Sequence, residues 1–246
     1  MNLRAEAYTR KQLGEALENP NIEMVYAPYS IVDESLSEYS ERIILVPPVF
    51  LADCEESVVK RCCELKKVGF NNILVHTIGH IELFRDFSLF GGYRLNCVNS
   101  DSIDFYSENN VADIIVSPEL TAYQINKLST DSNIGFIAYG HLPLMITRRC
   151  PIKNGKPCNK EYCKRFITDR KGNKSAVICN ENTAEILNSD VLYLGDKLDS
   201  FNSVSFAVLK FTVEDSITPI IISYIKNELS DNKGFTRGLY FRGVVN

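Results

Sequence analysis

Short apolar runs alternate with amphipathic stretches along the first 146 residues of this chain. Seven runs have the length and β-branched content of buried strands, and loops with Pro, Asn or Ser separate them from helical patterns. The expected strands are Arg4–Tyr8, Met24–Ala27, Ile43–Val46, Ile73–His76, Tyr93–Val98, Asp113–Val116 and Ile134–Tyr139. Such alternation predicts a parallel sheet with helices on its faces.

Three of the intervening segments begin with a helix-capping pattern, in which a capping side chain precedes a carboxylate or an amide by three residues. The pairs are Thr9 with Gln12, Asp53 with Glu56, and Thr121 with Gln124. This spacing satisfies two backbone N–H groups at the start of a helix. The segment 55–68 then carries apolar side chains at helical spacing and is followed by Gly69, so we expect a helix there.

Seven strands before residue 147 favour a closed or nearly closed barrel, although periodicity alone does not separate a barrel from an open sheet. We therefore predict a TIM-barrel-like α/β repeat, complete or incomplete, over residues 1–146. Residues 147–246 are expected to form a Cys-rich basic loop followed by an α/β extension that packs on the barrel. Ligands bind at the carboxyl ends of the strands in both kinds of sheet. His76, Glu119 and His141 fall at such ends.

Turn-forming residues dominate the start of the second region, and short β-like runs follow at 175–178, 191–194 and 204–213. A last helix is expected to begin at Pro219, with Thr218 as its cap, because proline favours the first turn of a helix. The tail 234–245 contains Phe235, Tyr240 and Phe241. Because this tail is so aromatic, we expect it to fold back on the body of the protein.

The chain has eight cysteines, and their use depends on the compartment in which the protein resides. Its first residues lack the apolar core of a signal peptide, and no apolar run is long enough to cross a bilayer. We therefore expect a cytoplasmic protein, in which thiols stay reduced and serve packing, catalysis or metal binding. The hydrophobic share of 45% is ordinary, so the chain should form a proper core.

Four of the cysteines, Cys150, Cys158, Cys163 and Cys179, lie in or beside the turn-rich segment, with seven, four and fifteen residues between successive members. A segment that turns repeatedly can wrap one metal centre, and four thiolates suit either zinc or a [4Fe–4S] cluster. The spacing lacks the paired C-x-x-C motif of zinc ribbons, and this favours the cluster. The other four cysteines are expected to serve packing.

The same segment is strongly basic. Between Arg148 and Lys174 it has ten Lys or Arg residues against two carboxylates, a local balance of +8, whereas the whole chain carries −4. Such a segment either binds an anion, such as nucleic acid, a phosphate or a metal–thiolate centre, or is a solvated loop. The candidate anion-binding residues are Arg148, Arg149, Arg170 and Lys171, together with Arg237 near the C-terminus.

The common hydrolase motifs are absent from the sequence. It contains no H-E-x-x-H, no G-x-S-x-G and no glycine-rich phosphate loop. His141 follows Gly140 at one expected strand end, and Glu119 follows another. These positions make His141 and Glu119 candidate catalytic acid–base residues, although side chains at a barrel rim also serve structural roles.

The run 140–151, Gly-His-Leu-Pro-Leu-Met-Ile-Thr-Arg-Arg-Cys-Pro, resembles the signature of the peptidase U32 family, the collagenase-like group. The stretches 117–120, 169–172 and 186–189 resemble further motifs of that family, and 235–243 resembles its C-terminus. Together these motifs span about residues 110–246. The βα part before them resembles the second, C-terminal barrel of the long members.

This resemblance implies a barrel-like fold and a [4Fe–4S] cluster needed for hydroxylation of RNA bases or quinone precursors. Cys150 matches the signature cysteine, and Cys158 or Cys163 and Cys179 lie where later ligands fall. Many members have another cysteine where this chain has Pro143, so a cluster here would need both Cys158 and Cys163. The leading hypothesis is therefore an iron–sulfur protein that hydroxylates an RNA base.

Two alternatives stay open at the level of the sequence. The family carries the label of peptidase, and zinc in the same four cysteines would make the chain a non-catalytic, zinc-stapled module of a larger enzyme. The resemblance also implies partners, namely RNA and either a separate N-terminal U32 half or a second copy of this chain. No membrane partner is expected.

Overall fold

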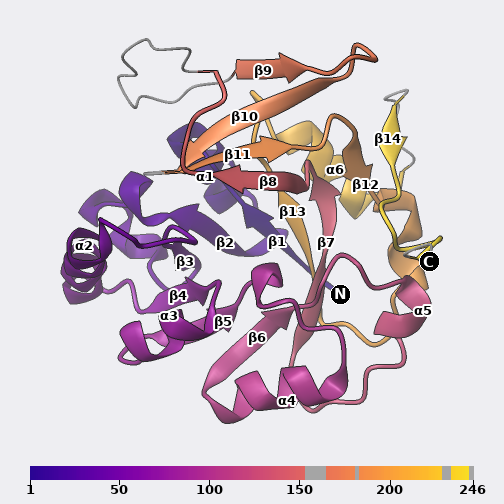
Figure 1. Cartoon of the computed structure of the whole chain (residues 1–246). Helices are drawn as coiled ribbons and strands as arrows, with labels where there is room; N and C mark the ends of the chain where they lie inside the picture. Colours follow the sequence, from indigo (N-terminus) through magenta and orange to yellow (C-terminus); the bar gives the residue numbers. More distant parts are fainter. Residues whose placement is uncertain (153–164, 181–182, 229–233, 244–246) are drawn as a thin grey trace.

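Eight parallel strands close into a barrel in the computed structural model, which describes residues 1–152, 165–180, 183–228 and 234–243 (Figure 1). The barrel strands are β1 (Asn2–Glu6), β2 (Ile22–Pro28), β3 (Ile43–Val46), β4 (Asn72–Val75), β5 (Ser88–Gly91), β6 (Val111–Ile115), β7 (Ile134–Gly140) and β13 (Phe206–Lys210). β13 pairs with β1 on one side and with β7 on the other, and this closes the ring. The predicted TIM-barrel-like fold is confirmed.

Helices connect the barrel strands on the outside of the ring (Figure 1). The α-helices are α1 (Arg10–Glu18), α2 (Glu55–Lys67), α3 (Ile78–Leu83), α4 (Ser100–Glu108), α5 (Ala122–Ile125) and α6 (Thr218–Ile225). Thr9 and Thr121 cap α1 and α5 through the expected capping boxes. The cap expected at Asp53 is wrong, because α2 begins after Cys54 without a side-chain cap. Within the described ranges, no helix is long and apolar enough to cross a membrane.

Two barrel strands differ from the sequence-based expectation. The fifth strand is Ser88–Gly91, whereas the expected run Tyr93–Val98 forms a short 3-10 helix and a loop that buries Leu95 and Cys97. The eighth strand, β13, comes from residues 206–210, so the expected boundary at residue 146 lies before the barrel is complete. A barrel closes when its last strand pairs with its first, and no local pattern of the sequence records that pairing.

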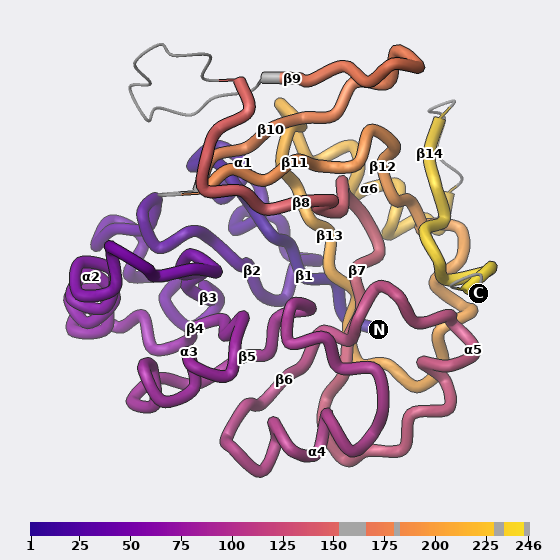
Figure 2. Tube along the Cα trace, viewed as in Figure 1, coloured from indigo at the N-terminus to yellow at the C-terminus, as the bar shows by residue number. Residues whose placement is uncertain are grey.

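Between β7 and β13 the chain forms a separate antiparallel sheet, which we call the cap sheet. Its strands are β8 (Pro143–Thr147), β9 (Arg165–Thr168), β10 (Lys174–Asn180) and β11 (Thr183–Leu187), in the order β8-β11-β10-β9. Ala176, Ile178 and Leu187 of this sheet form an apolar cluster that packs with Tyr8 and Val213. Figures 1 and 2 show the cap sheet across the end of the barrel at which β7 ends. Of its strands, the sequence predicts only β10.

The C-terminal part of the chain packs beside β7. β12 (Val191–Tyr193) pairs with the end of β7, and β14 (Phe235–Thr236) pairs with β12. Tyr240 is 1% exposed and packs edge to face against Phe136 and Phe201. The aromatic tail is therefore part of the core, which agrees with its composition.

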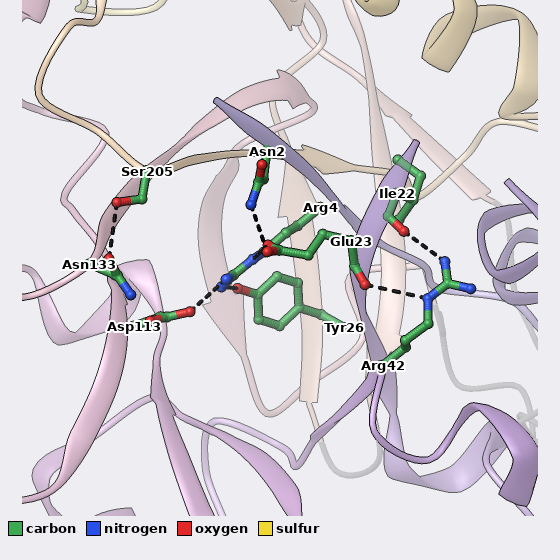
Figure 3. Close-up of polar contacts among 9 residues, drawn as sticks. All are labelled: Asn2, Arg4, Ile22, Glu23, Tyr26, Arg42, Asp113, Asn133 and Ser205. Carbon is green, nitrogen blue, oxygen red and sulfur yellow. Dashed lines mark hydrogen bonds and ion pairs between the residues drawn. The ribbon is translucent and has the colours of Figure 1, made fainter. Parts of the chain in front are cut away.

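A buried arginine lies in the amino-terminal half of the barrel interior (Figure 3). Arg4 of β1 donates to Glu23 at 2.8 Å and to Asp113 at 2.6 Å. Its guanidinium carbon lies 3.8 Å from the centre of the Phe206 ring. These contacts join β1, β2, β6 and β13 at the end of the barrel opposite the usual ligand site, so we assign them a structural role.

Candidate functional site

A small cavity lies at the carboxyl end of the barrel, beneath the cap sheet. Its volume is about 40 Å³, and both the barrel and the cap sheet line it. The polar lining residues, which we call the mouth cluster, are Glu6, His76, Tyr93, Arg94, Glu185 and Lys210. Five of the six stand at or just after the ends of barrel strands, where α/β barrels bind their ligands. Glu185 comes from β11 of the cap sheet.

Two ion pairs cross the mouth cluster. Lys210 Nζ donates to Glu6 Oε1, and Arg94 donates to Glu185 at 2.9 Å. The first pair joins β13 to β1, and the second ties the loop after β5 to the cap sheet. Burial by itself would lower the pKa of Lys210, but the interactions with Glu6, Tyr93 and Glu185 together outweigh that effect and raise the pKa above its usual value. Lys210 therefore remains an ammonium ion.

Two neutral histidines lie beside these pairs. Burial lowers the pKa of His76 well below its usual range, with further contributions from His80 and the nearby cations, and burial lowers the pKa of His80 to about 4. The His76 ring is hydrogen-bonded to the backbone of Pro47, whose only hydrogen-bonding group is its carbonyl oxygen. His76 Nδ1 is buried without a hydrogen-bond partner among the described residues. The ring proton therefore lies on Nε2, and Nδ1 presents a lone pair.

We expect these histidines to make the fold sensitive to acid. An unfolded histidine titrates near pH 6.5, so between about pH 6.5 and 4 the unfolded chain binds more protons than the folded one. The free energy of unfolding is then highest above pH 6.5 and falls as the pH decreases. For His80 the loss should be about 2 kcal/mol between pH 8 and pH 5. Urea denaturation at pH 8 and at pH 5 measures this loss of unfolding free energy. The variant His80→Gln should lose about 2 kcal/mol less than the wild type over the same pH range. If both proteins lost the same amount, the pH dependence would not come from His80.

The cap sheet brings two of the predicted metal ligands to one end. Cys179 of β10 pairs with Ala184 of β11, which pairs with Thr147 of β8. Cys150 follows Thr147 by three residues, beyond the end of β8. Since neighbouring strands are about 4.8 Å apart, the Cα atoms of Thr147 and Cys179 are roughly 10 Å apart. Ile178 lines the mouth cavity, so its neighbour Cys179 points to the other face of the cap sheet.

The other two predicted ligands, Cys158 and Cys163, lie outside the described residues. The chain leaves the described part after Ile152 and returns at Arg165, which opens β9 opposite Val177. Ile152 and Arg165, the two residues that border this gap, lie toward the same end of the cap sheet as Cys179. Within the described residues, no group of three or more His, Cys, Asp or Glu side chains is arranged to hold a metal ion. The four-cysteine centre therefore stays a prediction.

Two of the remaining cysteines, Cys62 and Cys97, are packing residues rather than nucleophiles, whereas the packing role expected for Cys63 is wrong because its side chain is exposed. Cys62 and Cys97 are both 0% exposed. Burial raises the pKa of Cys62 to about 12 and that of Cys97 to about 11. A thiol whose pKa is raised in this way is rarely a thiolate at neutral pH and reacts slowly. Cys63 is exposed on α2.

The two predicted acid–base residues do not line the mouth cavity. Glu119 is exposed in the loop after β6. His141, at the end of β7, donates from Nδ1 to the carbonyl oxygen of Asn188 at 2.7 Å. This hydrogen bond ties β7 to the loop after β11, so the contact that the structure gives His141 is a structural one.

The predicted anion-binding residues of the basic segment are divided between the two ends of the cap sheet. Arg148 and Arg149 are exposed near the end that carries Cys179, and Arg148 pairs with Asp53. Arg170 and Lys171 are exposed in the turn between β9 and β10. That turn lies roughly 20 Å away along β10, given a rise of about 3.3 Å per residue. One compact anion could not contact both pairs.

Arg237 has a different environment from the other predicted anion-binding residues. It donates to Asp196 at 2.9 Å and to the carbonyl oxygen of Tyr193 at 2.8 Å. Its guanidinium carbon lies 4.6 Å from the centre of the Phe235 ring. These contacts attach the C-terminal tail to β12 and to the short 3-10 helix Gly195–Ser200 that follows it.

Of the mouth cluster, the sequence indicated only His76, as a residue at a strand end. Two of the residues that the sequence analysis missed stand out by their position in the sequence. Lys210 is the one charged residue in the apolar run 206–211, and Glu6 lies in the middle of the first expected strand, Arg4–Tyr8, between two alanines. A charge inside a buried strand needs a partner in the fold. Arg94 and Glu185 carry no such signal.

These features define an α/β-barrel protein with a polar site at its carboxyl end and an inserted antiparallel sheet above that site. The family model for Peptidase family U32 matches residues 32–210, which include barrel strands β3 to β7 and β13 and all four strands of the cap sheet. The chain belongs to the U32 family. Neither the curated proteins nor the solved structures include a significant match to it.

Proposed function

We propose that this chain is an iron–sulfur protein of the U32 family that takes part in the hydroxylation of an RNA base. The observation that carries the proposal is the register of the cap sheet, in which Cys179 of β10 lies at the same end as the last residue of β8, with β11 between the two strands, and β8 leads on to Cys150. A [4Fe–4S] cluster takes one thiolate per iron, and Cys150, Cys158, Cys163 and Cys179 would supply the four. When bound, such a cluster supplies one-electron chemistry.

The charges near the cysteines support an RNA partner. Arg148 and Arg149 are exposed next to Cys150. Exposed cations attract the phosphate backbone of RNA. Arg170 and Lys171, at the far end of the cap sheet, would contact a second part of an extended nucleic acid rather than the same phosphate.

The peptidase alternative has less support. A cysteine or serine peptidase needs its nucleophile beside a base in an accessible site. Among the described residues that line the mouth cavity there is no Ser or Cys. The buried thiols of Cys62 and Cys97 have raised pKa values, which is the opposite of activation.

We expect protein purified without oxygen to contain about four iron atoms and four sulfide ions per chain, with broad visible absorbance. Cys150→Ser and Cys179→Ser should each reduce the iron content to less than half. Each substitution removes a ligand at the same end of the cap sheet. Iron and sulfide analysis with a visible spectrum provides the measurement.

Cys63→Ser is the matched control, because Cys63 is exposed on α2 rather than in the cap sheet. Its iron content should equal that of the wild type. Stoichiometric zinc without iron in the anaerobic protein would replace the proposal with a zinc-stapled module. Unchanged iron in both cap-sheet variants would reject the ligand assignment.

The RNA step needs a separate measurement. Nucleosides from cells that lack this protein should lose one species that carries an extra oxygen atom, as seen by mass spectrometry. Wild-type protein should restore that species, and Cys150→Ser should not. An identical nucleoside profile with and without the protein would exclude RNA hydroxylation, whatever metal the protein holds.

A further inference from the structure

The hairpin of β9 and β10 stands clear of the barrel. Among the described residues β9 is the last strand of the cap sheet, and Figures 1 and 2 show β9 and the turn to β10 on the side of that sheet farthest from the barrel. The two strands pair from Arg165 with Val177 to Thr168 with Lys174, so the turn between them comprises residues 169–173. An edge strand that stands clear of the core offers its surface to a partner.

The turn of this hairpin occupies its one carboxylate internally and leaves its two cations exposed. Asp169 Oδ1 accepts hydrogen bonds from the backbone N–H groups of Lys171 and Asn173, at 2.7 Å and 2.9 Å. The side chains of Arg170 and Lys171 are exposed, and neither forms an ion pair within the described part of the chain. Two neighbouring cations without carboxylate partners attract an anion.

An exposed aromatic ring lies on the same hairpin. Phe166 of β9 is 53% exposed. Ala176 lies opposite Phe166, and Lys174 is two residues from Ala176, so all three side chains point to the same face of the sheet. The barrel covers only part of this face, because Ala176 is buried against Tyr8 whereas Phe166 and Lys174 are exposed.

The ring and the cations are spaced for an extended polymer. Lys174 is a diagonal cross-strand neighbour of Phe166, which brings the two side chains within about 7–8 Å of each other. Arg170 follows Phe166 by four residues, or about 13 Å at a rise of about 3.3 Å per residue. A lone exposed phenylalanine is common on protein surfaces, but one that is flanked by three unpaired cations matches a chain of negative charges that also carries flat rings.

Single-stranded nucleic acid has both of these features. Its phosphates recur along the strand, and its unpaired bases stack on aromatic side chains. An acidic protein segment would meet the cations, but it would have no particular use for the ring. In a duplex the bases are already stacked on one another, so their faces are not available.

We propose that the β9–β10 hairpin binds single-stranded RNA, with one base stacked on Phe166 and the phosphates held by the three exposed cations Arg170, Lys171 and Lys174. The choice of RNA rests on the proposed function, and the hairpin adds the surface that holds the strand. Stacking on an aromatic ring tolerates every base, so the hairpin would guide the strand without selecting the target base.

Binding of a labelled single strand of about 12 nucleotides to protein purified without oxygen tests the stacking, with fluorescence anisotropy as the measurement. Phe166→Leu removes the aromatic face but keeps an apolar strand residue, and it should weaken binding about tenfold or more. Phe166→Tyr keeps the ring and should bind as the wild type does. Phe105→Leu is the matched control, because Phe105 is 46% exposed on α4, away from the cap sheet (Figure 1).

The salt dependence of the same binding tests the phosphate contacts. Each phosphate contact of a single strand contributes about 0.7 to the slope of log K against log salt concentration, so Arg170→Ala/Lys171→Ala should reduce that slope by about 1.4. Lys60→Ala/Lys67→Ala removes two exposed cations of α2 instead and should leave the slope unchanged.

A comparison of probes on the wild type decides the question even if a variant fails to fold. The single strand should bind at least about tenfold more tightly than poly-glutamate of the same charge, because only the RNA can stack. Equal binding of the two probes would overturn the proposal in favour of a general anion surface or an acidic protein partner. So would a Phe166→Leu protein that binds the single strand as the wild type does.

These outcomes are distinguishable from those of the proposed function. If Phe166→Leu bound RNA normally while cells without the protein still lost the oxidised nucleoside, only the hairpin assignment would be rejected. If binding depended on Phe166 but the nucleoside profile did not depend on the protein, only the hydroxylation would be rejected.

Discussion

Replacement of Gly140 by alanine should lower the free energy of unfolding by on the order of 4 kcal/mol. Gly140 is the last residue of β7 and has a φ of 123°, a conformation that residues with a side chain rarely adopt. A Cβ atom there would lie 2.1 Å from the carbonyl oxygen of Lys210. β7 cannot easily move away, because Gly140 also pairs with Leu192 of β12. Urea denaturation measures the loss.

Gly14→Ala is the matched control for this substitution. Gly14 lies within α1, and an added Cβ atom would meet nothing within 4 Å. Because alanine favours a helix more than glycine does, this variant should be more stable than the wild type by about 0.5–1 kcal/mol. A Gly140→Ala protein as stable as the wild type would show that Gly140 does not lie so close to the carbonyl oxygen of Lys210 on β13.

Replacement of Lys210 by methionine should cost about 3–5 kcal/mol, because it leaves the Glu6 carboxylate without its cation beneath the cap sheet. The side chains of Lys210 and Glu6 are 7% and 17% exposed, so water compensates poorly. The double variant Glu6→Gln/Lys210→Met removes both charges and should recover most of the loss. A double-mutant cycle of urea denaturation separates the pair from its surroundings.

An exposed ion pair provides the comparison for this cycle. Lys226 and Glu228 are 3.7 Å apart, and their side chains are 59% and 53% exposed. Lys226→Met should change the stability by less than about 0.5 kcal/mol, since such pairs are screened by solvent. If Lys210→Met were equally mild, the Lys210–Glu6 pair would be solvated in solution, and the barrel mouth would be open rather than covered by the cap sheet.

The Arg94–Glu185 pair connects the barrel mouth with the cap sheet. Glu185 and Ala184 are neighbours on β11, and alternation along a strand sends one side chain toward the cavity and the other toward the opposite face. The same alternation separates Ile178 from Cys179 on β10. One thin sheet therefore carries residues of the mouth cavity on one face and a predicted metal ligand on the other.

Local patterns in the sequence are sufficient to predict the alternation of strands and helices that builds the barrel and several features of these elements. Strand Ile43–Val46 and the capping boxes of Thr9 and Thr121 lie where the pattern placed them, because strand alternation and helix caps involve residues a few positions apart. The motif of residues 140–151 is likewise a continuous stretch of chain, so it indicates the U32 family directly, and the family match confirms this membership.

The closure of the barrel and the residues at its mouth depend instead on contacts between distant parts of the chain. β13 pairs with β1, and Lys210 meets Glu6 across 204 positions of the chain. The cap sheet likewise depends on pairings that join Thr147, Ala184 and Cys179. Such contacts form because strands from distant parts of the chain bury their apolar faces together, and charged residues at the strand ends then pair with one another. A local periodicity contains no information about which strands will be neighbours.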